Sequence, residues 1–179
     1  MLLDDQTVAV LTGYMTDERI GERMVARLAV QIVGADGVVG KSTTIAVGLP
    51  EEWRPNCSHL MWSSDAGPLS DAVTELREFR REHGARPVLY MQQHSALAND
   101  LILAGMPSAA MNNVSDEVRA ILRKATGHVA TDEQLLHSLV AYCAGVSGAQ
   151  PYEGLSQFPD CTHDAIAFGR CVGVLRRLA

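Results

Sequence analysis

A long β-rich stretch near the N-terminus constrains the fold of this chain more than any other feature. Residues 24–34 and 38–47 are rich in Val, Ile, Leu, Ala and Thr, and β-branched side chains favour extended strands. Between them stands Asp36-Gly37, a pair typical of tight hairpin turns because glycine adopts positive φ angles readily. We therefore predict an antiparallel hairpin, preceded by a short strand over residues 7–11.

The rest of the chain carries mostly helical signals. Apolar residues recur at helical spacing in several segments that end near glycines. One further short strand is expected over residues 88–91, and a loop over residues 12–22. We expect the helices to begin near these residues: Ser70, Leu97, Ser115, Thr131 and Thr162. Three strands followed by a helix, a strand and further helices predict an α/β or α+β layered domain.

The size of the chain predicts one domain over residues 1–179. It has 179 residues, of which 47% are hydrophobic and 20% charged, as in an ordinary single domain. Its longest apolar runs, such as residues 101–104, are far shorter than the ~20 residues of a membrane-spanning helix. Asp4 and Asp5 stand where a signal peptide would be basic. We therefore expect a cytoplasmic protein without membrane contact.

The cysteines show no metal-binding spacing. The chain has four, at positions 57, 143, 161 and 171, and no pair is separated by two residues. We interpret them as reduced structural thiols. A zinc site built from Cys57, Cys161 and His163 is an alternative that no spacing rule supports.

The segment Ala35–Ser42 matches a permissive form of the phosphate-binding loop. In that loop, successive backbone N–H groups surround the phosphates, and a helix follows the lysine. Here residues 42–48 are β-branched, and Pro50 follows shortly after Ser42, which favours a strand. We therefore favour the hairpin and keep a nucleotide-binding loop only as a third functional alternative.

The C-terminal segment carries the motif that is most readily compared with a known family. Residues 163–169, His-Asp-Ala-Ile-Ala-Phe-Gly, resemble the last motif of DEDDh-type 3′–5′ exonucleases, in which a catalytic Asp follows the His after five residues. Residues 87–97 resemble the central motif of that family, and residues 22–47 are similar to its second and third strands. The similarity spans roughly residues 7–178. It implies a ribonuclease-H-like (DnaQ-like) α/β fold, with a three-strand meander and then helices around a mixed central sheet.

The same resemblance implies that the family's catalytic site is degenerate here. That chemistry needs four carboxylates around two Mg²⁺ or Mn²⁺ ions and a His that activates water. The carboxylate positions are occupied instead by Leu11, Gly13, Ala96 and Phe168, and only His163 is retained. We therefore expect no metal cofactor. The expected function is a non-catalytic interaction or regulatory module with a protein partner and residual nucleic-acid contact.

Two enzymatic alternatives remain. In the first, Asp100, Asp164 and either Asp17 or Glu18 replace the lost ligands, and the chain is a metal-dependent exonuclease that uses Mg²⁺ or Mn²⁺. In the second, the chain is similar to resolvases of the RuvC type, whose closing Asp-Ala-Leu-Ala motif residues 164–167 resemble. That family also needs a Glu on the central strand, where this chain has Gln92-Gln93.

Individual site residues have structural as well as functional interpretations. His163 would be the general base of an active site, and Asp164 either a catalytic acid or a favourable charge at a helix N-terminus. Phe168 is expected to fill the space of the missing metal cluster.

The formal net charge of −6 predicts no general attraction to nucleic acid. A basic rim for nucleic acid, or simply solvated helix faces, is expected from six residues: Arg80, Arg81, Arg86, Arg119, Arg123 and Lys124. The sequence also leaves a homo-oligomer open.

Overall fold

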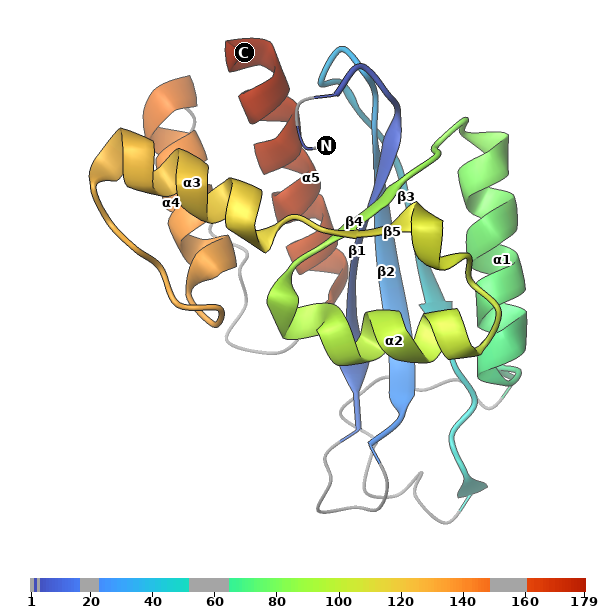
Figure 1. Ribbon diagram of the computed structural model, residues 1–179. Coiled ribbons are helices and arrows are strands. Elements are labelled where there is room, and N and C mark those ends of the chain that lie inside the picture. The colour runs from blue at the N-terminus through green and yellow to red at the C-terminus, as the bar shows by residue number, and fades with distance from the viewer. Residues whose placement is uncertain (1, 3, 17–22, 52–64, 149–160) are drawn as a thin grey trace.

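A mixed sheet of five strands in the order β3-β2-β1-β4-β5 forms the centre of the molecule (Figure 1). The structure is a computed structural model, and it describes residues 2, 4–16, 23–51, 65–148 and 161–179. Strands β1 (Val8–Met15), β2 (Val25–Val33) and β3 (Val39–Ala46) form an antiparallel meander. Strands β4 (Val88–Tyr90) and β5 (Met111–Asn113) extend the sheet on the other side of β1, in parallel. The predicted meander and mixed sheet are confirmed.

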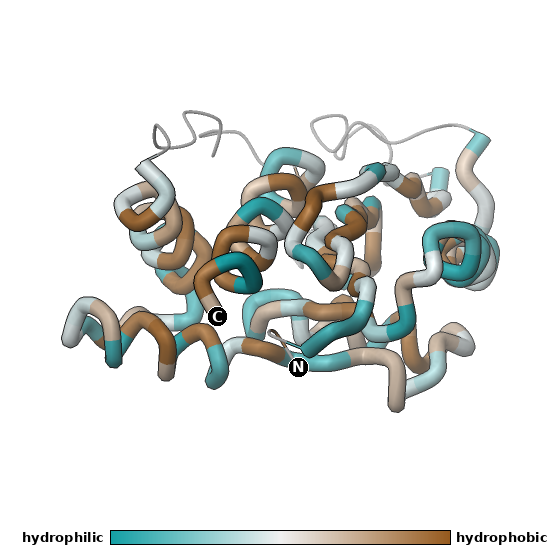
Figure 2. The backbone as a smooth tube through the Cα atoms, turned by 90° about the horizontal axis from the view of Figure 1, so that it is seen from above, coloured by the Kyte–Doolittle hydropathy of each residue, from teal (hydrophilic) through white to brown (hydrophobic). Residues whose placement is uncertain are grey.

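In the described part of the chain, five α-helices cover the two faces of the sheet. They are α1 (Leu69–Glu82), α2 (Ser95–Leu103), α3 (Ser115–Thr126), α4 (Leu135–Ser147) and α5 (Cys161–Leu178). Short 3₁₀ turns, η3 (Gln92–His94) and η4 (Ser108–Ala110), precede α2 and β5. One hydrophobic cluster joins the sheet to α1 and α2, and another joins it to α3, α4 and α5. Seen from the front and from above, α3 and α4 lie on one side of the molecule and α1 on the other (Figures 1 and 2).

The turn between β2 and β3 is the hairpin that Asp36-Gly37 predicts. Gly37 has φ +77°, and its N–H donates to the carbonyl of Gly34 over 3.0 Å. The N–H of Val38 donates to a carboxylate oxygen of Asp36, also over 3.0 Å. Because Ser42 lies inside β3, which continues to Ala46 where a phosphate-binding loop requires a helix, the phosphate-binding-loop interpretation of Ala35–Ser42 is wrong.

Several predicted element ends differ from the structure. Strand β1 continues to Met15, through the first part of the predicted loop 12–22. Strand β5 is not predictable from its sequence, because Met-Asn-Asn has little β propensity. Ser70, Ser115 and Thr162 lie in the first two residues of their helices rather than before them, and α4 begins at Leu135 rather than near Thr131.

The described cysteines are free thiols. Cys143, Cys161 and Cys171 are buried, and Cys57 lies outside the described residues. The Sγ atom of Cys143 donates to the carbonyl of Cys171 over 3.8 Å. A hydrogen bond with Cys143, together with burial, raises the pKa of the Cys171 thiol, which keeps it protonated. None of the helices in the described ranges is long and apolar enough to span a bilayer.

Candidate functional site

The first turn of α5 rests on the carboxyl half of β1. The hydroxyl of Thr12 donates a hydrogen bond to the carbonyl oxygen of Cys161 over 2.6 Å, and Thr12 is only 1% exposed. From β3, the hydroxyl of Thr44 lies 2.9 Å from that of Thr162. These contacts place His163 and Asp164, both half-buried, near the carboxyl end of β1.

Small residues let the rest of α5 approach the sheet closely. A Cβ atom on Gly169 would collide with the side chain of Gln31 on β2. A Cβ atom on Gly173 would lie 2.5 Å from the carbonyl oxygen of Gly37 in the hairpin turn. At the far end of α5, Arg177 donates to that same carbonyl over 2.6 Å. Helix α5 is therefore fixed along its length, and its first turn is held in one position relative to β1.

Alternation along β1 decides which of its residues face α5. Val8 and Val10 belong to the hydrophobic cluster that contains α5, and Ala9 and Leu11 belong to the cluster of α1 and α2. Since successive strand residues point to opposite faces, Thr12 also faces α5, as its hydrogen bond to Cys161 shows.

The next two residues of β1 continue the alternation. Tyr14 packs with Ala29, Cys161 and Ala165 on the α5 side. A Cβ atom on Gly13 would instead meet the side chain of Leu97 on α2. The structure therefore places Leu11 and Gly13, the predicted degenerate positions, on the face opposite His163. At the carboxyl end of β1, the residues on the face of His163 are Thr12 and Tyr14, each one position further along the strand.

Phe168 and Ala96 have different surroundings. Phe168 is 1% exposed and belongs to the hydrophobic cluster that also contains Val10, Leu89 and Met91. Ala96 lies half-buried in the first turn of α2, whose buried residue Leu97 packs on the other face of the sheet. An apolar ring thus occupies the interior of the α5 face.

The acidic residues proposed as relocated ligands are distributed over two helices on opposite faces. Asp100 lies on α2, where burial raises the pKa of its carboxyl and the nearby Arg23 partly offsets this. Asp164 lies in the first turn of α5. Asp17 and Glu18 are outside the described residues. Among the residues that the structure describes, no group of three or more His, Cys, Asp or Glu side chains could hold a metal ion.

His94 stands where β4 leads into α2. Burial lowers the pKa of its imidazole to about 4, so the ring is neutral near pH 7. Its Nε2 atom lies 3.2 Å from the side-chain nitrogen of Gln93. The imidazole of His94 is therefore neutral and in hydrogen-bond contact with the side chain of its neighbour Gln93.

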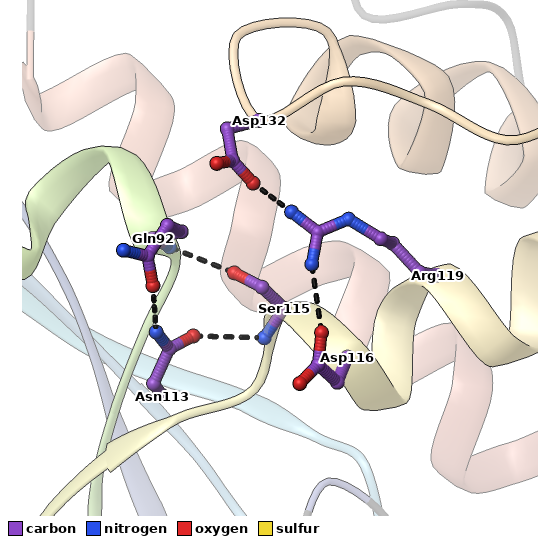
Figure 3. A network of polar contacts seen from close by, with 6 residues as sticks. All are labelled: Gln92, Asn113, Ser115, Asp116, Arg119 and Asp132. Atoms are coloured by element: carbon purple, nitrogen blue, oxygen red, sulfur yellow. Dashed lines mark hydrogen bonds and ion pairs between the residues drawn. The ribbon is translucent and has the colours of Figure 1, made fainter.

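A polar network occupies the end of the central strand (Figure 3). The backbone N–H of Gln92 donates to the hydroxyl of Ser115 over 2.7 Å, and Asn113 donates to the side-chain oxygen of Gln92 over 2.5 Å. The N–H of Ser115 donates to Asn113 over 3.0 Å. Gln92, for which the resemblance to resolvases would require a Glu, therefore joins the end of β4 to β5 and to the start of α3.

The six basic residues do not form one rim. Arg80, Arg81 and Arg86 line a pocket at the carboxyl end of α1. Arg119 on α3 forms ion pairs with Asp116 at 2.8 Å and with Asp132 (Figure 3). Arg123 and Lys124 are exposed in the last turn of α3. Because α1 and α3 pack on opposite faces of the sheet, the two groups are separate surfaces.

The chain is similar in fold to a known nuclease. It matches the structure of a moderately thermophilic exonuclease I from Methylocaldum szegediense with a TM-score of 0.57 and 12% identity, over 96% of this chain. The chain spans 40% of the length of that protein. No protein-family model matches the sequence. No curated protein matches it either. At this identity the similarity shows the fold alone, which is the exonuclease-type, ribonuclease-H-like α/β fold.

Proposed function

We propose that this chain is a non-catalytic protein of exonuclease fold, which acts by binding a protein partner and not by cleaving nucleic acid. The observation that carries the proposal is the buried hydrogen bond between Thr12 and Cys161. It occupies the face of β1 on which the resemblance to DEDDh exonucleases requires a metal-binding carboxylate.

The chemistry of the neighbouring side chains supports this proposal. Mg²⁺ and Mn²⁺ prefer carboxylate and other hard oxygen ligands. The side chains that face α5 from the end of β1 are a hydroxyl, in Thr12, and a phenol, in Tyr14. Phe168, at the position of the last carboxylate, is buried among apolar residues. Asp164 is the one carboxylate in the first turn of α5, and a single carboxylate would bind a divalent cation weakly.

An apolar hollow between α3, α4 and α5 supports a binding role. It has a volume of about 380 Å³, and its lining includes Ile121, Tyr142 and Leu175. Leu178, which also lines it, is 57% exposed. Exposed apolar side chains around a concavity are typical of protein-interaction surfaces.

A nuclease assay tests the non-catalytic half of the proposal. Purified protein is incubated with end-labelled single-stranded DNA and RNA in Mg²⁺ and in Mn²⁺, beside the variant Asp164→Asn, which keeps the shape of the side chain. The expected result is no cleavage by either protein. Cleavage by the wild-type chain that is lost in Asp164→Asn would establish the relocated-ligand nuclease instead.

The binding half is tested on the hollow. The chain and the variant Leu178→Ser are compared by affinity capture and cross-linking, with Leu103→Ser as a matched control, because Leu103 is 86% exposed and lies away from the hollow, on α2. We expect a captured protein that is lost with Leu178→Ser and kept with Leu103→Ser. Equal capture by all three proteins would show that the hollow is not the binding surface.

A further inference from the structure

Four arginines gather around one pocket at the carboxyl end of α1. The pocket has a volume of about 550 Å³, and Arg77, Arg80, Arg81 and Arg86 line it together with a single acidic residue, Glu78. The formal charge of the lining is therefore +3 (four arginines less one glutamate). The chain as a whole has a net charge of −6. The lining of this pocket therefore has the opposite sign of charge to the whole chain.

Among the residues that the structure describes, the four guanidinium groups have no acidic partner. Within the described residues, no carboxylate oxygen lies within 4.0 Å of any of them. Arg119 on α3 shows the contrast, because it pairs with both Asp116 and Asp132. The arginines of the pocket are thus available to a ligand.

Arg80 is the least solvated of the four. It is half-buried, and its Nε atom is buried without a hydrogen-bond acceptor. Within the described part of the chain, the one partner of its Nη1 atom is the sulfur of Met106, at 3.9 Å. Burial, and to a lesser extent the charge of Arg77, lowers the pKa of Arg80. A partly desolvated cation beside a like charge is unfavourable, and a bound anion would relieve both effects.

Local structure holds the arginines in place. Arg77, Arg80 and Arg81 share one face of α1, because residues three and four apart are neighbours on a helix. The chain then turns back, with the N–H of Ala85 bonded to the carbonyl of Arg80 over 2.9 Å. The N–H of Arg86 donates to the carbonyl of Thr7 over 3.1 Å, which fixes the fourth arginine at the start of β4.

We propose that this pocket binds a small phosphate-bearing anion with at least two negative charges. Guanidinium groups bind phosphate oxygens in pairs, through parallel hydrogen bonds. A lining charge of +3 matches a dianion or a diphosphate better than a single carboxylate. The site is independent of the proposed function: it lies where β4 begins, beyond the amino end of the parallel pair β1–β4, whereas His163 lies where β1 ends.

Calorimetric titration of the full chain with pyrophosphate tests the proposal. We expect saturable binding, which Arg80→Gln weakens by about tenfold or more, since each hydrogen bond to a charged group contributes that much. Arg80 is half-buried, so its replacement also affects the stability of the fold. Arg77 and Arg86 are exposed, and Arg77→Gln and Arg86→Gln therefore test the pocket in a protein that folds as the wild type does. Arg123→Gln, an exposed arginine on α3, is the matched control and should bind as the wild type does.

Two further arms identify the source of the phosphate. One titrates ADP, and the other compares a 5′-phosphorylated single-stranded oligonucleotide with its 5′-hydroxyl form. Binding of ADP or of the phosphorylated oligonucleotide that is lost in Arg77→Gln supports the site and names its ligand class. Absence of saturable binding by every probe would overturn the proposal, as would equal weakening in Arg123→Gln.

Discussion

The hydroxyl of Thr12 donates to the carbonyl oxygen of Cys161 over 2.6 Å, which joins β1 to the first residue of α5. We expect Thr12→Val to lower the free energy of unfolding by about 1 kcal/mol, the usual contribution of one intramolecular hydrogen bond. Thr12→Ser keeps the donor and should lie close to the wild type. Urea denaturation measures both values, and a Thr12→Val variant as stable as the wild type would mean that this bond contributes nothing.

Gly169 allows α5 to approach β2, because a Cβ atom there would collide with Gln31. Gly169→Ala is therefore expected to destabilise the protein by about 1–3 kcal/mol, as overpacking of an interior does. Gly145→Ala is the matched control, since Gly145 lies in α4 and a Cβ atom there meets nothing within 4 Å. It should stabilise the protein by about 0.5–1 kcal/mol through helix propensity. Thermal unfolding distinguishes the two outcomes.

Phe168 fills the interior of the α5 face at 1% exposure. Phe168→Ala removes most of a buried aromatic side chain and is expected to cost about 3–5 kcal/mol. Phe168→Leu retains much of the volume and should cost clearly less. Denaturant midpoints of the two variants give the comparison. A small loss in Phe168→Ala would contradict the assignment of this residue to the core.

Burial lowers the pKa of His94 to about 4, below the ordinary value near 6.5. Between these values the unfolded chain binds a proton that the folded chain does not, so stability falls as the pH falls from about 6.5 to about 4. The His94 contribution is at most about 1.4 kcal/mol per pH unit. We expect His94→Gln to remove this contribution, as measured by urea denaturation at pH 7 and pH 5. An identical pH dependence in the variant would show that His94 is not responsible.

The hairpin and the order of the elements could be predicted because local chemistry determines them. Asp36 and Gly37 specify the turn whatever surrounds them, and Gly127 ends α3 with φ +72° in the place where the sequence indicates. The apolar periodicity of the helices likewise reflects their burial on one face. The general α/β class followed from these local signals.

The face of each β1 residue could not be read from the sequence. Thr12 and Gly13 suggest the start of a loop, and their alternation becomes visible only when Met15 pairs with β2. The resemblance to DEDDh exonucleases assigns the degenerate positions to Leu11 and Gly13, whereas the structure brings Thr12 and Tyr14 to the α5 side. A shift of one residue exchanges the two faces of a strand.

The grouping of the basic residues also depended on tertiary structure. Arg77 carries no signal of its own in the sequence, although its spacing from Arg80 and Arg81 places it on the same helix face. Arg86 joins them only because the chain turns back after α1. Arg119 is separated from them because α3 covers the opposite face of the sheet.

The central claim, that the α5 face no longer holds a divalent metal, is tested most directly by titrating the protein with Mn²⁺ and following the electron paramagnetic resonance signal of the free ion. We predict that equimolar wild-type protein leaves this signal unchanged and that Asp164→Asn gives the same trace. Loss of the signal with the wild-type chain, and its recovery with Asp164→Asn, would contradict the claim.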